Sequence, residues 1–236
     1  MASNPMQWCC VVGVKHDGTP KGQLKKIGDK NGSTQNAVLI MTDVIGMDFP
    51  NVQLIADQFA TNGYFTVIPD VFNGNECPFP TPESFDLQEY FKTKIPGVPQ
   101  VDPMYESVIK HLREELGVKR LGGVGHCFGG KYVCAYRIDF YFYRNVSFFK
   151  RYKCYQTREQ SLTVCAETDF IFSTEKRCET EDILKEHTVP YQVFLYSDVE
   201  HGFGVKGDLS HAKARFAKEQ AFMQAVHWFD EYVKKR

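Results

Sequence analysis

The chain has 236 residues, of which 43% are apolar and 14% aromatic, and its formal net charge is −1. This length suits one α/β domain over residues 1–236, and a nearly neutral chain lacks the basic footprint that nucleic acid or an anionic membrane would require. No apolar stretch approaches the roughly 18 residues of a membrane-spanning helix, and the N-terminus lacks the basic and apolar regions of a signal peptide. We therefore predict a cytoplasmic protein with neither a nucleic-acid nor a membrane partner.

Short apolar runs alternate with amphipathic segments along the chain. Strands are predicted at 38–41, 64–69, 120–125, 162–166 and 191–196, of which the last alternates between apolar and polar residues. Helices are predicted at 51–62, 104–116, 131–135, 174–186 and 212–234. The proline-rich stretch 73–103 is predicted to be a long loop with one short helix near 85–92. Because strands alternate with helices, the predicted fold class is α/β, with a mostly parallel, doubly wound sheet flanked by helices.

A glycine-rich turn joins the strand at 120–125 to the following helix. Its pattern is Gly125-x-Cys127-x-Gly129, the form of a nucleophile elbow with cysteine in place of serine. At the start of a helix, free N–H groups and the helix dipole favour a thiolate. The N–H group of Phe128, directly after Cys127, is placed to serve an oxyanion hole. Taken alone, the same turn could also carry an inert thiol.

The residues after the two last strands supply partners for this cysteine. α/β-Hydrolases order their triads as nucleophile, acid and histidine, each on a loop that follows a strand. Asp169 follows the strand at 162–166, and His201 follows the strand at 191–196. We predict that His201 takes the proton of the Cys127 thiol or pairs with the thiolate, and then protonates the leaving group. Asp169 is predicted to orient the imidazole of His201.

Other histidines and acids compete for these roles. The alternative acids are Glu167 and Asp198, which also lie near strand ends. The alternative histidines are interpreted as pocket, packing or surface residues, and they are His126, His187, His211 and His227.

The loop after the first strand contains Asp43 and Val44. In α/β-hydrolases this loop supplies the second oxyanion N–H group, for which Val44 is the candidate. Asp43 either holds the resting Cys127 or its proton, or it is a loop or capping aspartate.

The eight cysteines lie at positions 9, 10, 77, 127, 134, 154, 165 and 178. They contain no C-x-x-C pair, and no His/Cys cluster has zinc spacing along the chain. We predict reduced thiols, no metal and no cofactor.

As a set, these motifs resemble the dienelactone hydrolase family of the α/β-hydrolase superfamily, in particular its fungal cytosolic branch. The resemblance rests on Cys9–Gly22, Thr42–Gly46, Leu54–Gly63, Pro69–Phe72, Val124–Tyr132, Ala166–Phe172, Glu200–Phe203, Gly207-Asp208 and the final helix. It implies an α/β-hydrolase fold, the triad Cys127, Asp169 and His201, and oxyanion N–H groups at Val44 and Phe128. It also implies that Asp43 contacts the resting cysteine and that Lys206 meets a substrate carboxylate. At the position of Lys206 the family often carries arginine. An arginine can donate two parallel hydrogen bonds to a carboxylate, which a lysine cannot.

Two segments depart from the family pattern. Between 27 and 37 the chain is shorter than relatives, which have a strand there. In the atypical segment 135–160 we identify neither the helix end, nor the added strand, nor the His-Pro-Ser-like loop of relatives. This basic and aromatic segment is either a divergent stretch that still covers the sheet or an insert that contacts a membrane or partner. Loss of a central strand would disturb both sheet pairing and triad geometry.

The sequence thus predicts a cysteine-nucleophile hydrolase of a small ester, enol-lactone or thioester that works through an acyl-enzyme, as a monomer or homodimer. One alternative is a catalytically impaired α/β-hydrolase-fold binding protein or thiol sensor. Another is acyl transfer to an acceptor other than water.

Overall fold

The computed structural model describes residues 6–21, 34–133, 140–143, 160–186 and 190–235. Its strands are β1 (Asn36–Met41), β2 (Phe65–Val67), β3 (Arg120–Gly125), β4 (Phe140–Tyr143), β5 (Gln160–Thr168) and β6 (Tyr191–Glu200). Its α-helices are α1 (Pro50–Thr61), α2 (Leu87–Thr93), α3 (Val98–Glu114), α4 (Gly130–Val133), α5 (Thr174–Lys185), α6 (Phe203–Lys206) and α7 (Ala212–Phe229). Two 3₁₀ turns, η1 (Trp8–Cys10) and η2 (Cys127–Gly129), and a π-helical turn, η4 (Asp230–Lys234), complete the described elements.

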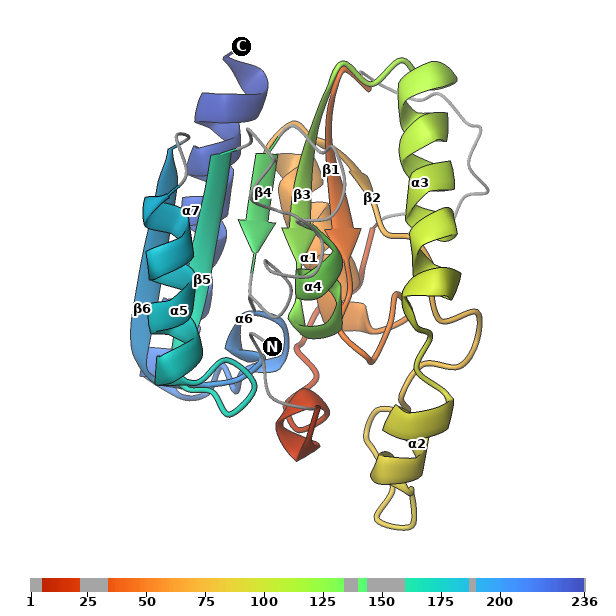
Figure 1. The fold of residues 1–236 in the computed structure, drawn as a ribbon, viewed down its shortest axis with the longest axis vertical. Helices are drawn as coiled ribbons and strands as arrows, with labels where there is room; N and C mark the ends of the chain where they lie inside the picture. The colour runs from red at the N-terminus through yellow and green to blue at the C-terminus, as the bar shows by residue number, and fades with distance from the viewer. Residues whose placement is uncertain (1–5, 22–33, 134–139, 144–159, 187–189, 236) are drawn as a thin grey trace.

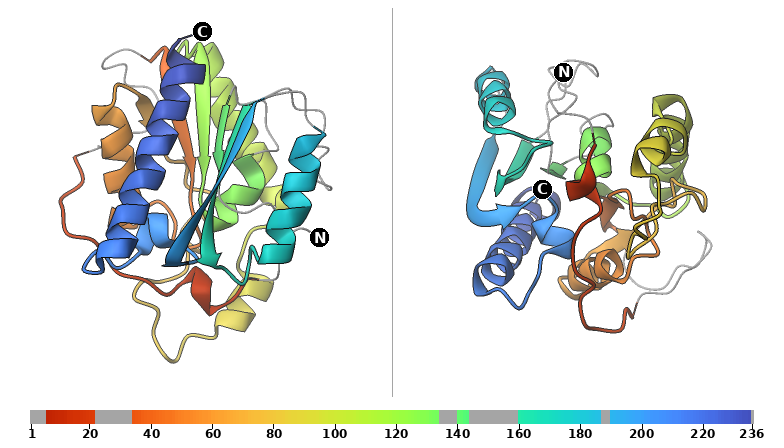
Figure 2. Two further views of the ribbon diagram at one scale, coloured as in Figure 1. Left: turned by 90° about the vertical axis from the view of Figure 1, so that its left-hand side faces the viewer. Right: turned by 90° about the horizontal axis from the view of Figure 1, so that it is seen from below.

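The six strands form one sheet in the order β2-β1-β3-β4-β5-β6, and all neighbouring pairs are parallel. Helices α1 and α7 cover one face of the sheet, and α3, α4 and α5 cover the other (Figures 1 and 2). The carboxyl ends of the strands share one edge, where η1, α2 and α6 also lie (Figure 1). Open α/β sheets build their sites at this edge. The predicted doubly wound α/β fold is confirmed.

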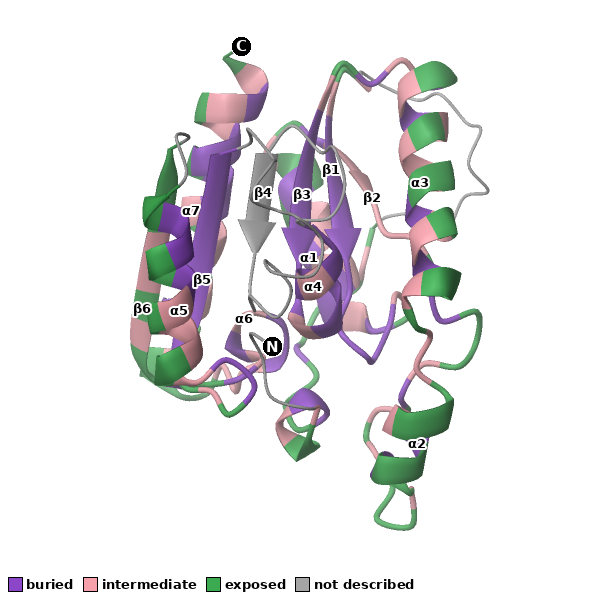
Figure 3. Cartoon of the chain, in the orientation of Figure 1, coloured by how far each residue is buried: buried purple, intermediate pink, exposed green. Residues whose placement is uncertain are grey.

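The centre of the sheet carries the core. Strands β1, β3 and β5 are buried over most of their length, whereas the edge strand β6 is mostly half-buried or exposed (Figure 3). This difference explains why the central strands are continuous apolar runs while β6 alternates. No described helix is both long and apolar enough to cross a bilayer.

Several boundaries differ from the sequence-based prediction. The stretch 73–103 is not one long loop, because α3 already begins at Val98. Pro99 lies in the first turn of that helix, where the missing N–H group costs no hydrogen bond. Strands β5 and β6 extend beyond their predicted ends, to Thr168 and Glu200, because backbone pairing continues through polar residues that the apolar pattern excludes.

Strand β4 corrects the prediction for the segment 135–160. Phe140–Tyr143 pairs in parallel with β3 on one side and β5 on the other. The expectation that this segment lacks the strand of its relatives is therefore wrong, and the sheet is continuous from β3 to β5. Apart from Gln160, which begins β5, the remainder of the segment lies outside the described residues, as does most of the shortened stretch 27–37.

Candidate active site

Cys127 occupies a strained turn between β3 and α4. Its φ angle is 48°, in the left-handed region that non-glycine residues rarely adopt, at a cost of about 1–2 kcal/mol. The turn also requires glycine beside it. A Cβ atom on Gly129 would lie 2.1 Å from the carbonyl oxygen of Met41, and one on Gly125 would lie 2.8 Å from the carbonyl oxygen of Gly129. These close approaches fix the turn and place the thiol at the carboxyl edge of the sheet.

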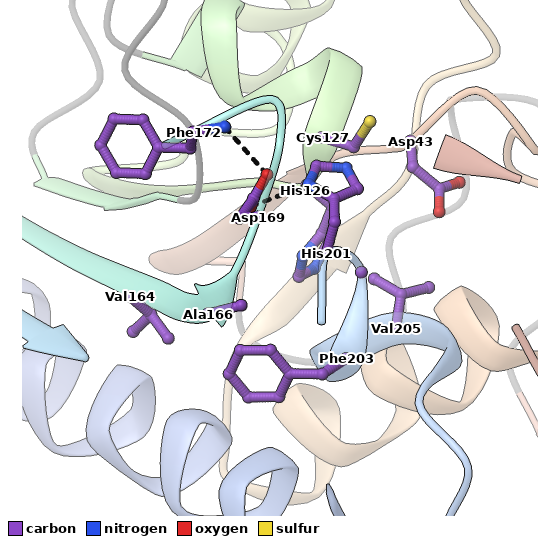
Figure 4. Close-up of a pocket in the computed structure, with 11 residues that line it drawn as sticks. Asp43, His126, Cys127, Val164, Ala166, Asp169, Phe172, His201, Phe203 and Val205 are labelled. Carbon is purple, nitrogen blue, oxygen red and sulfur yellow. Dashed lines mark hydrogen bonds and ion pairs between the residues drawn. The ribbon is translucent and has the colours of Figure 1, made fainter. Parts of the chain in front are cut away.

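Asp169 and His201 meet at the same edge, on the loops that leave β5 and β6 (Figure 4). His201 Nδ1 lies 2.9 Å from Asp169 Oδ2, and the two side chains are 4% and 9% exposed. The backbone N–H of Phe172 donates to the other oxygen of Asp169 at 2.8 Å, so both carboxylate oxygens have partners. The N–H of His201 donates to the carbonyl of Thr168 at 3.1 Å, which ties the histidine loop to β5.

The thiol of Cys127 lies beside the imidazole. The Sγ atoms of Cys127 and Cys10 and one ring nitrogen of His201 all lie within 4.8 Å of one another. The neighbouring Cys10 thiol and the charge of His201 hold the pKa of Cys127 well below its usual range, against the opposing effect of burial. Burial alone would lower the pKa of His201, but the negative charge of Cys127 and the hydrogen bond to Asp169 raise it to about 10. Both shifts favour a thiolate on Cys127 and an imidazolium on His201.

A buried ion pair lies next to the thiol. Lys206 Nζ is 3.5 Å from Asp43 Oδ2, and the two side chains are 1% and 3% exposed. The backbone N–H of Ile45 donates to Asp43 Oδ1 at 3.1 Å. Burial raises the pKa of Asp43, and the lysine charge opposes that rise. Lys206 thus faces a carboxylate of the protein itself, on the inside of the site.

Val44 and Phe128 occupy the two loops on which the oxyanion groups were predicted. Both residues are buried, at 0% and 2% exposure. The carbonyl of Val44 accepts a hydrogen bond of 2.8 Å from the N–H of Cys77, which fixes the orientation of the Asp43–Val44 loop. The N–H of Val44 has no partner among the described residues.

The competing acids do not face His201. The carboxylate of Glu167 accepts a hydrogen bond from the backbone N–H of Asp198, and the carboxylate of Asp198 pairs with Lys213 at 2.6 Å. His126 is buried and lines the pocket beside Cys127.

The other competing histidines lie away from this pocket or outside the described residues. His211 pairs with Asp208 at the exposed start of α7, and His227 is exposed on the same helix. His187 lies outside the described residues.

Sequence reasoning missed how the N-terminal segment joins the site. Buried Asn51, on α1, accepts a hydrogen bond from the N–H of His16 and donates to the carbonyls of Val14 and Val205. The N–H of Val14 also donates to the carbonyl of Lys206 at 2.8 Å. These bonds hold the segment that carries Cys10 against α6. Nothing local marks Asn51, because its partners lie 35 to 154 positions away in sequence.

An elbow with Cys127 after β3, a loop with Asp169 after β5 and a loop with His201 after β6 follow the arrangement of the α/β-hydrolase fold. The same fold occurs in a dienelactone hydrolase from Anabaena variabilis, at 14% identity and a TM-score of 0.63 over 86% of this chain and 88% of that one.

The sequence model of the dienelactone hydrolase family matches residues 26–233. Hydrolase pyvD of Aspergillus violaceofuscus is 41% identical over the full length of both chains. Hydrolase tropI of Talaromyces stipitatus is 40% identical, again over both full lengths. A human carboxymethylenebutenolidase homolog is 29% identical over 84% of this chain and 82% of its own length. The chain belongs to the dienelactone hydrolase family, and it is a hydrolase of that family.

Proposed function

We propose that the protein hydrolyses a small ester, enol-lactone or thioester through an acyl-enzyme on Cys127. The observation that carries this proposal is the 2.9 Å contact between His201 Nδ1 and Asp169 Oδ2, with the thiol of Cys127 beside the same imidazole. This constellation provides a nucleophile, a group that gives and takes a proton, and an acid that orients it. The strained elbow supports the assignment, since strain of this kind clusters at functional sites.

The reaction begins with the thiolate of Cys127, which attacks the substrate carbonyl carbon. The N–H groups of Val44 and Phe128 stabilise the oxyanion. Collapse of the tetrahedral intermediate breaks the bond to the leaving group, which receives a proton from the imidazolium of His201. The neutral imidazole then takes a proton from water, whose oxygen attacks the thioester. The acid product departs, and the thiolate–imidazolium pair is restored.

The substrate is proposed to be small and to carry a carboxylate. Such a group would compete with Asp43 for Lys206, and the freed aspartate would then lie beside the thiol. Because Lys206 is only 1% exposed, an incoming carboxylate reaches it only by displacing its present partner. A thiol nucleophile suits an activated leaving group such as the enolate of an enol-lactone. The name of the family and the carboxymethylenebutenolidase homologs support this substrate class.

The proposed location is the cytoplasm. A nucleophilic thiol close to Cys9 and Cys10 is protected from oxidation in a compartment that keeps thiols reduced, which supports this location.

The test uses p-nitrophenyl acetate as substrate and iodoacetamide as inhibitor. Activity is expected to fall in proportion to the labelling of Cys127, and Cys127→Ser and His201→Ala are expected to lose activity. His211→Ala, which changes an exposed histidine, is the matched control and should remain active. Activity lost while Cys127 stays unlabelled would contradict the nucleophile assignment.

Two outcomes would point to the alternatives. A hydrolysis rate unchanged by both Cys127→Ser and His201→Ala would favour a non-catalytic binding protein or thiol sensor. Acylated products in the presence of added alcohols or thiols would instead indicate acyl transfer.

A further inference from the structure

Three potential metal ligands converge at the catalytic edge from distant parts of the chain. Cys10 comes from η1, Cys127 from the elbow, and His201 from the loop after β6. Their Sγ, Sγ and ring nitrogen atoms all lie within 4.8 Å of one another. Cys10 has no exposed surface, so its thiol faces only the protein interior. The proposed hydrolysis assigns no step to Cys10.

The imidazole of His201 is oriented so that its Nε2 atom can bind a cation. Its Nδ1 is held by Asp169, so the neutral ring keeps its proton there and presents the lone pair of Nε2. That Nε2 atom is buried and has no hydrogen-bond partner in the described part of the chain. A carboxylate that orients the distal nitrogen of a histidine is the usual outer shell of protein zinc sites.

We propose that Cys10, Cys127 and His201 form a binding site for a thiophilic divalent cation of the zinc class. In tetrahedral coordination, zinc lies about 2.3 Å from sulfur and about 2.0 Å from nitrogen. The ligand atoms are then separated by roughly 3.5–3.8 Å, so separations that are now within 4.8 Å need to shorten by no more than about 1 Å. Two thiolates neutralise the cation, and a fourth position stays open for water.

Cys127 enters as a thiolate, whereas the thiol of Cys10 and the imidazolium of His201 each release one proton to solvent when the cation binds. Binding therefore weakens as the pH falls.

The N-terminal segment keeps Cys10 in place for this role. The hydrogen bonds of Val14 with Lys206 and Asn51 fix the chain four residues beyond Cys10. A Cβ atom on Gly13 would lie 2.5 Å from the side chain of Lys206, so the segment packs directly against α6. A preordered ligand of this kind lowers the entropic cost of binding.

Binding would remove both the nucleophile and the proton carrier from the reaction. The cation would act as a reversible inhibitor, and this consequence alone rests on the proposed function. Binding itself does not depend on that function, so the two can fail separately.

The experiment titrates zinc chloride into the full-length protein, kept reduced with a phosphine, in competition with a chromophoric chelator. One ion per chain is expected. Cys10→Ser should weaken binding by about 100-fold or more, because loss of a ligand costs at least as much as loss of its outer-shell partner. Cys178→Ser, which changes an exposed cysteine on α5, is the matched control and should bind as wild type. Cadmium chloride provides a second readout, because the thiolate-to-cadmium ultraviolet absorption counts the sulfur ligands and should indicate two.

A readout on the unmodified chain covers the case in which Cys10→Ser fails to fold. Zinc should protect Cys127 of the wild-type protein from iodoacetamide, as measured by peptide mass spectrometry, while the exposed Cys178 stays reactive. Absence of stoichiometric binding, binding undiminished in a folded Cys10→Ser protein, or a cadmium spectrum with fewer than two thiolates would overturn the proposal. Zinc binding by a protein that hydrolyses no ester would sink the proposed function and leave the metal site standing.

Discussion

Replacement of Asp169 by asparagine tests the triad at its best-defined contact. The N–H of Phe172 needs an acceptor at 2.8 Å, so the side-chain oxygen of asparagine is expected to stay there. Its NH₂ group then faces Nδ1 of His201 and forces the ring to carry its proton on Nε2. In that tautomer the nitrogen next to Cys127 can no longer accept a proton.

The size of the effect follows from the same contact. Loss of a hydrogen bond to a charged group costs about 1.5–3 kcal/mol, which is about 10- to 150-fold in rate. The wrong tautomer brings the expected loss to about 10³- to 10⁴-fold. The assay is the turnover of p-nitrophenyl acetate at neutral pH, with urea unfolding to confirm that the variant folds.

Asp198→Asn is the matched control, since that exposed carboxylate pairs with Lys213 and not with the histidine. Its activity is expected to stay near that of the wild type. The reasoning is refuted if a folded Asp169→Asn protein retains activity within a few-fold of wild type, or if Asp198→Asn loses as much.

Three further predictions concern the elbow, the buried ion pair and the thiolate. Gly129→Ala places a Cβ atom against the carbonyl of Met41 and should lower the free energy of unfolding by about 3 kcal/mol; an unchanged urea midpoint would contradict the close approach. Lys206→Met leaves the buried Asp43 carboxylate without its cation and should cost about 3–5 kcal/mol. Adding Asp43→Asn should recover most of that stability, and a double variant no more stable than Lys206→Met would count against the pair. Because the pKa of Cys127 lies well below its usual value, its iodoacetamide alkylation rate should stay level from pH 9 to neutral and fall only in acid. A tenfold fall per pH unit below about 8.5, as for an ordinary thiol, would show that no thiolate pair exists.

The sequence predicted those parts of the site that are marked by a local residue spacing or by the order of residues along the chain. Gly125 and Gly129 flank Cys127 because the turn leaves no room for a Cβ atom at either position. In the sequence this constraint appears as a glycine two residues before the cysteine and another two residues after it. Asp169 and His201 follow strands, and the carboxyl ends of parallel strands meet at one edge. Chain order therefore predicted residues that the fold brings together.

The parts that sequence missed depend on distant contacts. Strand β4 is held by pairing with β3 and β5 on both sides, which the sequence of 135–160 does not reveal. Cys10 reaches the site through bonds between residues near 14, 51 and 205. The early start of α3 was hidden by prolines that usually indicate a loop. For β4 and Cys10 a tertiary contact decides the structure, whereas α3 begins early because a proline fits the first turn of a helix.

Trapping of the acyl-enzyme is the most direct test of the central claim. The wild-type protein is mixed with p-nitrophenyl acetate, quenched in acid within the first turnovers, and digested for peptide mass spectrometry. The account predicts one acetyl group per chain, on the peptide that contains Cys127, and its disappearance as the thioester hydrolyses. An acetyl group on any other residue, or active turnover with Cys127 never acylated, would contradict it.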